Sequence, residues 1–177
     1  YALEADRIPS MPPFPKVKSY NLRGPDFSWL QEADQMKVIE AIETKHRPIF
    51  LFLKYHYRRP SEACALFKTD YNMINNEFVI RRSFSARTLV DSTKTKAIHH
   101  VPCDDEFTAI ARRLVGENLN SKFLFINPRA RSSGKHYTNE SLNIIWDHAC
   151  EKVGIDPIGL YEGTKHSSCT QFIIKPA

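Results

Sequence analysis

The chain has 177 residues, of which 42% are hydrophobic and 25% are charged, a composition typical of a globular protein rather than a disordered or fibrous one. Lys and Arg total 25 against 20 Asp and Glu, and this formal net charge of +5 permits a polyanionic partner without requiring one. No apolar run is long enough to span a membrane, and no basic region followed by an apolar stretch marks a signal peptide.

The four cysteines are scattered, and none belongs to a C-x-x-C pair that could open a structural zinc site. Isolated cysteines of this kind are typical of reduced, core-packed side chains in intracellular proteins. Together with the composition, they predict a cytoplasmic protein without a membrane partner. We also expect no metal ion and no other cofactor. The cysteines are Cys64, Cys103, Cys150 and Cys169.

The first segment, residues 1–28, is predicted to be an extended arm rather than a domain. Its clustered prolines favour a polyproline-like path, and Lys16, Lys18 and Arg23 follow them. Two interpretations stay open, an arm lying on the protein surface or a linker from an upstream domain with its basic residues near a phosphate backbone. In both cases the folded domain is expected to occupy residues 29–177. The prolines are Pro9, Pro12, Pro13 and Pro15.

Three helices are predicted next. The first begins near Trp29, with one face formed by Leu30, Ala33, Met36 and Ile39. The second covers residues 47–57, with Pro48 in its first turn, and its residues 49–53 are apolar all round, which predicts a central, buried helix. Pro60 begins a short third helix.

A small antiparallel sheet is predicted between residues 77 and 102, with two or three strands. The segments 78–80 and 97–101 are short and β-like, and Asn75 and Asn76 supply turn chemistry before them. His99 and His100 alternate across a strand, so only one of them can face the core.

Helical periodicity returns in the second half. Asp104 is a natural N-cap for a helix with an apolar stripe, and the acidic run 104–106 is expected to complement the helix dipole rather than hold a metal. Residues 123–126 form a short buried segment, and a basic loop, 129–136, follows it. Thr138 and Gly154 delimit the clearest helix, and residues 165–172 are helical again. The stripe of the helix after Asp104 is Phe107, Ile110, Ala111, Leu114 and Val115.

Three clusters of residues carry the functional signal. The first is Arg59 with its spaced partners Glu62, Leu66 and Asp70. The second is Lys94, in a Lys-Thr-Lys segment that leads to Val101-Pro102, and the third is the segment 162–167, Glu-Gly-Thr-Lys-His-Ser. In this order, and over residues 29–170, they resemble the catalytic domain of the tyrosine recombinases, the phage integrase family.

The resemblance implies a mostly α, α+β fold, a helical catalytic domain with a small antiparallel β-sheet. It implies site-specific DNA recombination and integration, by strand cleavage and rejoining through a phosphotyrosyl intermediate, in a protein of a phage or mobile element. Double-stranded DNA would be the partner, and a full-length protein would form a homo-tetramer on it. The catalytic residues would be Arg59, Lys94, Glu162, Lys165 and His166.

The chemistry of phosphoryl transfer explains this choice of residues. Negative charge gathers on the non-bridging oxygens in the transition state, where fixed cations stabilise it. A guanidinium such as that of Arg59 offers two hydrogen bonds and stays charged, and a lysine such as Lys94 on a hairpin can protonate the leaving oxygen. A tyrosine hydroxyl would form the covalent link. No metal is needed, because side-chain cations supply the positive charge.

Two departures from the family pattern stand out. Glu162 occupies the position of a histidine and Lys165 that of an arginine, so Lys165 keeps the charge but loses the bidentate fork. The family's nucleophilic tyrosine follows the third motif after a further helix, whereas this chain stops at Ala177. We therefore expect that none of the seven tyrosines of the chain as given forms a covalent adduct with DNA.

Other interpretations remain open. Lys96 competes with Lys94 for the hairpin role, and Lys165 and His166 have ordinary structural uses at the start of a helix. At the level of the whole chain, the alternative is a catalytically inactive DNA-binding remnant of an integrase. A further alternative is a globular interaction domain with no nucleic-acid role.

Overall fold

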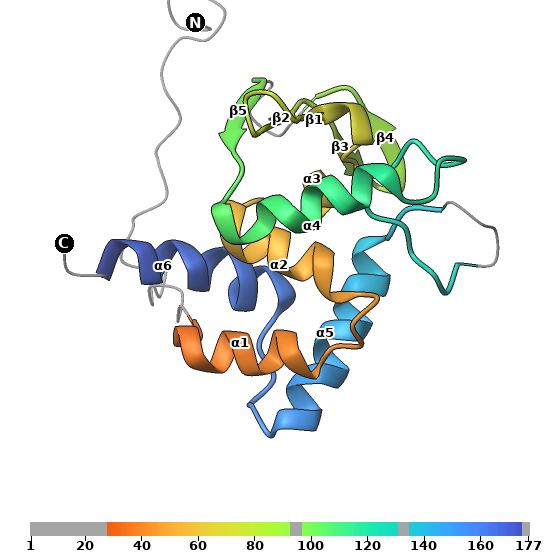
Figure 1. The fold of residues 1–177 in the computed structure, drawn as a ribbon. Helices are drawn as coiled ribbons and strands as arrows, with labels where there is room; N and C mark the ends of the chain where they lie inside the picture. Colours follow the sequence, from red (N-terminus) through yellow and green to blue (C-terminus); the bar gives the residue numbers. More distant parts are fainter. Residues whose placement is uncertain (1–27, 93–96, 131–134, 175–177) are drawn as a thin grey trace, which may run out of the picture.

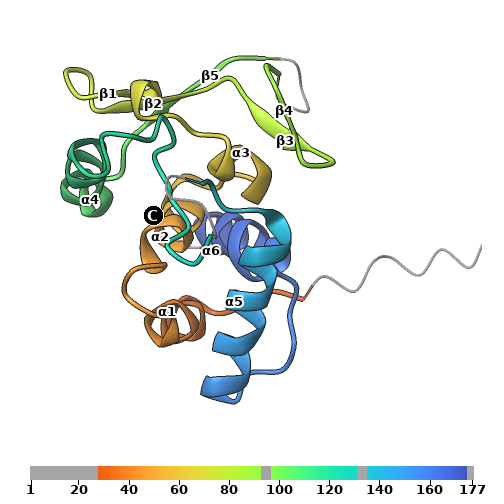
Figure 2. The same cartoon turned by 90° about the vertical axis from the view of Figure 1, so that its right-hand side faces the viewer.

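The computed structural model describes residues 28–92, 97–130 and 135–174 (Figure 1). Lys94 and Lys96 therefore lie outside the described residues, as do residues 1–27 of the expected arm. Within the described part, a body of helices carries two small antiparallel sheets at one end, as the view of Figure 2 shows. This is the predicted α+β, mostly α architecture. In the same part of the chain, no helix is long and apolar enough to cross a membrane.

Helix α2, Arg47–His56, is the centre of the body. Its Pro48 lies in the first turn, where the missing N–H costs nothing, and Phe52 and Leu53 are fully buried. The ring of Phe52 packs against the rings of Phe78 and Phe107, which come from the sheet and from α4. The predicted central helix is thus confirmed.

Helix α1, Glu32–Ala41, differs from its prediction. It starts at Glu32 rather than near Trp29, and Ala33 is exposed. The buried face is Gln35, Val38 and Ile39, because the amide of Gln35 finds buried partners in a segment distant in the sequence. The predicted face did not include Gln35, which belongs to the core.

The other helices follow their predictions closely. Helix α3, Pro60–Cys64, is short, and α4, Asp105–Gly116, begins after Asp104, whose carboxylate accepts the Glu106 N–H. Helix α5, Asn139–Val153, is capped by Thr138 and ends at Gly154, which has a φ of 68°. The left-handed conformation explains why glycine ends this helix. The η2 turn, Lys68–Asp70, precedes the first strand.

Among the described residues, five strands form two sheets, where two or three strands were predicted. Strand β2, Glu77–Ile80, pairs with β1, Tyr71–Asn72, and with β5, His99–Pro102; β3, Ser83–Ser85, pairs with β4, Thr88–Val90. The second hairpin is short and serine-rich, so it carries no alternating apolar pattern. Ala86 and Arg87 close it with φ values of 44° and 70°.

The last helical stretch contains a turn that the sequence pattern did not predict. Residues Glu162–His166 form a π-helical turn, η3, that continues directly into α6, Ser167–Ile174. The Ser167 N–H bonds to the Glu162 carbonyl, five residues earlier, instead of four. Such single-turn bulges are uncommon and frequently occur at functional sites.

Candidate active site

Arg59 stands at the junction between α2 and α3. Tyr57 ends α2 in the left-handed conformation, with φ 53°, and this turns the chain so that Arg59 becomes the N-cap of α3. The carboxylate of Glu62 accepts the Arg59 backbone N–H at 3.2 Å and a guanidinium N–H at 3.2 Å. Glu62 is only 5% exposed, so the spaced pair Arg59 and Glu62 fixes both the start of the helix and the guanidinium.

The charge of Arg59 is well supported. Burial alone would lower its pKa, but the hydrogen bond and charge of Glu62, together with the Tyr161 side chain, raise the pKa above its ordinary value. The Arg59 side chain remains 30% exposed. It is therefore a fixed cation that an anion can still reach from solvent.

A small cavity of about 300 Å³ opens beside Arg59. Its wall carries several hydroxyl groups, which can donate hydrogen bonds to an anion. Ser92 is the last described residue before the segment 93–96, so the chain reaches the cavity two positions before Lys94. Lys94 itself lies outside the described residues. The residues lining the cavity are Arg59, Ser61, Glu62, Ser83, Phe84, Ser85, Val90 and Ser92.

The η3 turn holds the third cluster, and two core residues from elsewhere support it. Gln35 of α1 donates to the carbonyls of Gly163 and Thr164 at 3.0 and 3.1 Å, and so satisfies acceptors at the irregular turn. Gly163 lies against the Trp146 indole, where an added Cβ would come within 2.4 Å of a ring carbon. The turn is thus held from α1 on one side and α5 on the other.

Tyr161 joins the third cluster to the first. Its side chain is close enough to the Arg59 guanidinium to help raise the pKa of Arg59, and its ring centroid lies 4.5 Å from that of His166. The Lys165 ammonium lies 5.6 Å from the centre of the same ring. The structure therefore brings Arg59, Lys165 and His166 together around one tyrosine.

Glu162 belongs to the same turn but faces a different neighbour. Its carboxylate lies over Gly159, where an added Cβ would approach a carboxylate oxygen to 2.3 Å. Its backbone carbonyl accepts the hydroxyl of Ser167 at 2.7 Å. No hydrogen bond between the Glu162 carboxylate and Arg59, Lys165 or His166 is found among the described residues.

Asp70, the last residue of the first motif, has a structural position. It is 2% exposed, accepts the Phe67 N–H at 2.8 Å, and pairs with the guanidinium groups of Arg81 and Arg82. It therefore ties the η2 turn to the segment between β2 and β3. Arg58, the neighbour of Arg59, points elsewhere, as its guanidinium donates to the His56 carbonyl at 2.7 Å.

The other histidines of the predicted sheet and the basic loop lie apart from this cluster. His99 is partly exposed and His100 is exposed, and His100 pairs with Glu77 within the sheet. Arg129 of the basic loop pairs with Glu43 beside α1. No group of three His, Cys, Asp or Glu side chains able to hold a metal occurs in the described ranges. All four cysteines are free thiols, and three of them are buried.

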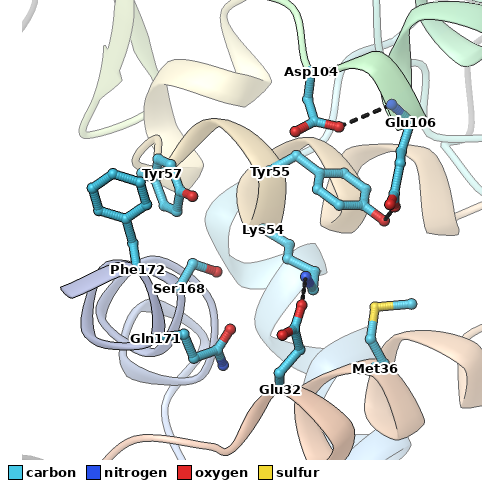
Figure 3. A pocket seen from close by; sticks show the side chains of 10 residues that line it. All are labelled: Glu32, Met36, Lys54, Tyr55, Tyr57, Asp104, Glu106, Ser168, Gln171 and Phe172. Atoms are coloured by element: carbon cyan, nitrogen blue, oxygen red, sulfur yellow. Dashed lines mark hydrogen bonds and ion pairs between the residues drawn. The ribbon is translucent and has the colours of Figure 1, made fainter. Parts of the chain in front are cut away.

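A second cavity, of about 310 Å³, lies between α1, α2 and α6 (Figure 3). Its polar groups largely face one another, since Lys54 pairs with Glu32 and the Tyr55 hydroxyl bonds to Glu106. Burial and the hydrogen bond with Glu106 raise the pKa of Tyr55 above its ordinary value, so the phenol stays neutral. With three carboxylates in its wall, Glu32, Asp104 and Glu106, this cavity suits a polyanion less well than the one beside Arg59.

Sequence reasoning missed two residues of the site. Gln35 was not singled out, and nothing in its local pattern distinguishes it from an exposed helical glutamine. Tyr161 was considered only as a possible nucleophile, although it directly precedes the third motif. Its position next to Glu162 was the available signal.

Comparison with protein families and solved structures agrees with this fold. A model described as the phage integrase family matches residues 28–173. Comparison with curated protein sequences gave no match. The Tn1549 transposon integrase in complex with a circular intermediate DNA is similar, with a TM-score of 0.73 and 17% identity over 97% of this chain and 61% of that chain.

Two further solved structures show the same likeness. The Tn1549 integrase in complex with transposon right end DNA has a TM-score of 0.68 and 15% identity, over 90% of this chain and 56% of that chain. The XerA recombinase has a TM-score of 0.61 and 16% identity, over 82% of this chain and 50% of that chain. The chain thus spans about 61% or less of the length of these proteins, and the likeness establishes the shared fold.

Proposed function

Because the chain belongs to the phage integrase family, we propose that it is the catalytic domain, or a fragment of the catalytic domain, of a site-specific DNA recombinase. The reaction would cleave and rejoin DNA strands through a phosphotyrosyl intermediate. Residues 29–177 would form the catalytic domain, and residues 1–28 the arm that precedes it. The observation that carries the proposal is the convergence of Arg59 and Lys165 on Tyr161, from segments far apart in the sequence.

The cluster suits a phosphodiester for electrostatic reasons. Arg59 is fixed by Glu62 yet 30% exposed, and Lys165 adds a second positive charge from the η3 turn. Fixed cations beside the non-bridging oxygens stabilise the charge that develops there, without reorganisation during the reaction. The serine hydroxyls beside Arg59 offer neutral donors for the same phosphate group.

Lys94, Glu162 and His166 complete the proposed catalytic set. Lys94 would protonate the leaving 5′ oxygen. It follows Ser92, which lines the Arg59 cavity, by two positions in the sequence. His166 lies against Tyr161 beside the two cations and would bind the phosphate or exchange a proton there. Glu162, facing Gly159, would act on its neighbours within the turn rather than on the phosphate.

The partner would be duplex DNA, and the full-length protein would assemble as a tetramer on it. The Tn1549 integrase structures contain DNA, which supports the first part of this proposal. A fluorescence anisotropy titration of labelled duplex at low salt tests it, with affinity expected to fall steeply as salt rises. Arg59→Ala should weaken binding, whereas Arg113→Ala, which removes an exposed charge on α4, should have a smaller effect. Complete absence of binding by the wild-type chain would refute the proposal.

A second candidate is a DNA-binding remnant of an integrase that has lost catalysis. Glu162 and Lys165 favour it, because an ionised carboxylate donates no hydrogen bond in place of the family's histidine, and a lysine lacks the bidentate fork of the family's arginine. A nicked suicide substrate separates the two, using the protein expressed from its complete reading frame. A covalent protein–DNA band on a denaturing gel supports the recombinase, and binding without such a band supports the remnant.

A further inference from the structure

Tyr161 contacts three candidate residues, although it lies outside the matched motifs. Its side chain lies near enough to Arg59 to help raise the pKa of the guanidinium, and its ring lies beside His166 and Lys165. The residue is partly exposed rather than sealed in the core. One residue thus offers a polar end to the first cluster and an aromatic surface to the third.

The π-helical turn explains how Tyr161 reaches both Lys165 and His166. In a regular α-helix, side chains four positions apart share a face, but those five positions apart diverge. The five-residue hydrogen bonding of η3 widens the turn, and both Lys165 and His166 lie beside the Tyr161 ring. The irregular turn therefore builds the contact surface of Tyr161.

The contact with Arg59 leaves the phenol proton available. A guanidinium has only donors, so a hydrogen bond between the two side chains uses the Tyr161 oxygen as acceptor. The O–H of Tyr161 must then find an acceptor elsewhere, and no such acceptor is found among residues 28–92, 97–130 and 135–174. A donor held next to a fixed cation is suited to an anion that binds the same cation.

The third motif has lost donors that a phosphate would use. Lysine at position 165 presents a point charge in place of a planar fork, and Glu162, when ionised, only accepts hydrogen bonds. We propose that Tyr161 is a phosphate-binding residue, whose hydroxyl accepts from Arg59 and donates its own proton to a non-bridging oxygen of the DNA phosphate. This inference rests on the proposed function, since it adds a donor to the same site.

The test separates the hydroxyl from the ring. Tyr161→Phe removes the O–H but keeps the ring beside His166 and Lys165, and Tyr55→Phe is the matched control, since its hydroxyl bonds Glu106 in the other cavity. Binding of inorganic phosphate is followed by NMR, and binding of a short DNA duplex by anisotropy. The indole N–H signal of Trp146, which bonds the Ile158 carbonyl, reports that the turn is intact.

We expect Tyr161→Phe to weaken phosphate binding about tenfold, the usual size of one hydrogen bond to a charged group, with Tyr55→Phe unchanged. The ring signals of His166 should shift little in Tyr161→Phe and strongly in Tyr161→Leu, which removes the ring as well. Unchanged phosphate binding in Tyr161→Phe, with binding lost in Arg59→Ala, would overturn the role of Tyr161 and leave the proposed function standing. If Arg59→Ala also binds phosphate normally, both proposals fail.

Discussion

The two segments that supply the cations of the site are held in different ways. Arg59 is fixed by a partner three residues away, since the Glu62 carboxylate accepts both the Arg59 backbone N–H at the start of α3 and a guanidinium N–H. Lys165 belongs to a π-helical turn that depends on Gln35 from α1 and on close packing of Gly163 against Trp146. The first segment is held by contacts between residues close in the sequence. The second depends on contacts with helices that are distant in the sequence.

This difference also marks what could be predicted from the sequence. The spacing of Arg59 and Glu62 is visible in the chain, and so were the short helix and the buried helix before it. The π-helical turn, the burial of Gln35 and the contact of Tyr161 with Arg59 arise from tertiary packing, which no local pattern encodes. The serine-rich hairpin beside Arg59 was not predicted for a related reason, since its strands have no alternating apolar pattern.

The strongest way to break the second segment is to fill the space at Gly163. Gly163→Ala would place a Cβ within 2.4 Å of the Trp146 ring, a rigid group that is itself fully buried. We expect the free energy of unfolding to fall by about 3 kcal/mol, as for other overpacked core positions. Urea denaturation measures this loss. Gly116→Ala, which meets nothing within 4 Å at the end of α4, is the control and should be neutral or slightly stabilising.

Gln35 tests the same segment through its hydrogen bonds. Gln35→Met keeps the volume but leaves the carbonyls of Gly163 and Thr164 without their buried donor. The expected cost is about 2 to 3 kcal/mol, the penalty of unsatisfied buried polar groups. Gln31→Ala, an exposed change just before α1, should leave the unfolding midpoint unchanged. Equal midpoints for the Gln35→Met variant and the wild type would show that the turn stands without α1.

The first segment should be sensitive to pH through His56, at the end of α2. Burial lowers the pKa of His56 from 6.5 to about 4, against the weaker opposing effect of its bond to the Phe52 carbonyl. One ring nitrogen bonds that carbonyl and the other accepts the Asp104 N–H, so the neutral form uses both. The unfolded chain binds the proton more tightly, and stability is therefore lost as pH falls from 6.5 towards 4.

This linkage is worth about 2 kcal/mol of unfolding free energy between pH 7 and pH 5. Urea unfolding of wild type and His56→Phe at both pH values isolates it, because carboxylate titration is common to the two proteins. The variant, which keeps a ring beside Phe52 and Phe78, should be less stable at pH 7 but lose less on acidification. Parallel losses in the two proteins would exclude His56 as the source.

Lys165 offers the smallest and most specific change. Lys165→Arg restores a planar fork at the third motif, and we expect it to tighten binding of duplex DNA about threefold, as a bidentate contact replaces a point charge. Anisotropy at fixed salt measures it. Lys152→Arg, at the end of α5, is the control for a general preference of DNA for arginine. A gain in affinity of the same size in both variants would show that DNA prefers arginine at any surface position, and that position 165 has no special role.

The central claim is that Arg59 and Lys165 act on one phosphate, and a double-mutant cycle tests it most directly. Duplex affinity is measured for wild type, Arg59→Ala, Lys165→Ala and the double variant at one salt concentration. If both cations serve the same phosphate, the double variant should bind little worse than the weaker single variant, since side chains that share a partner couple strongly. Losses that simply multiply would show that the two residues contact separate phosphates, and would contradict a single site.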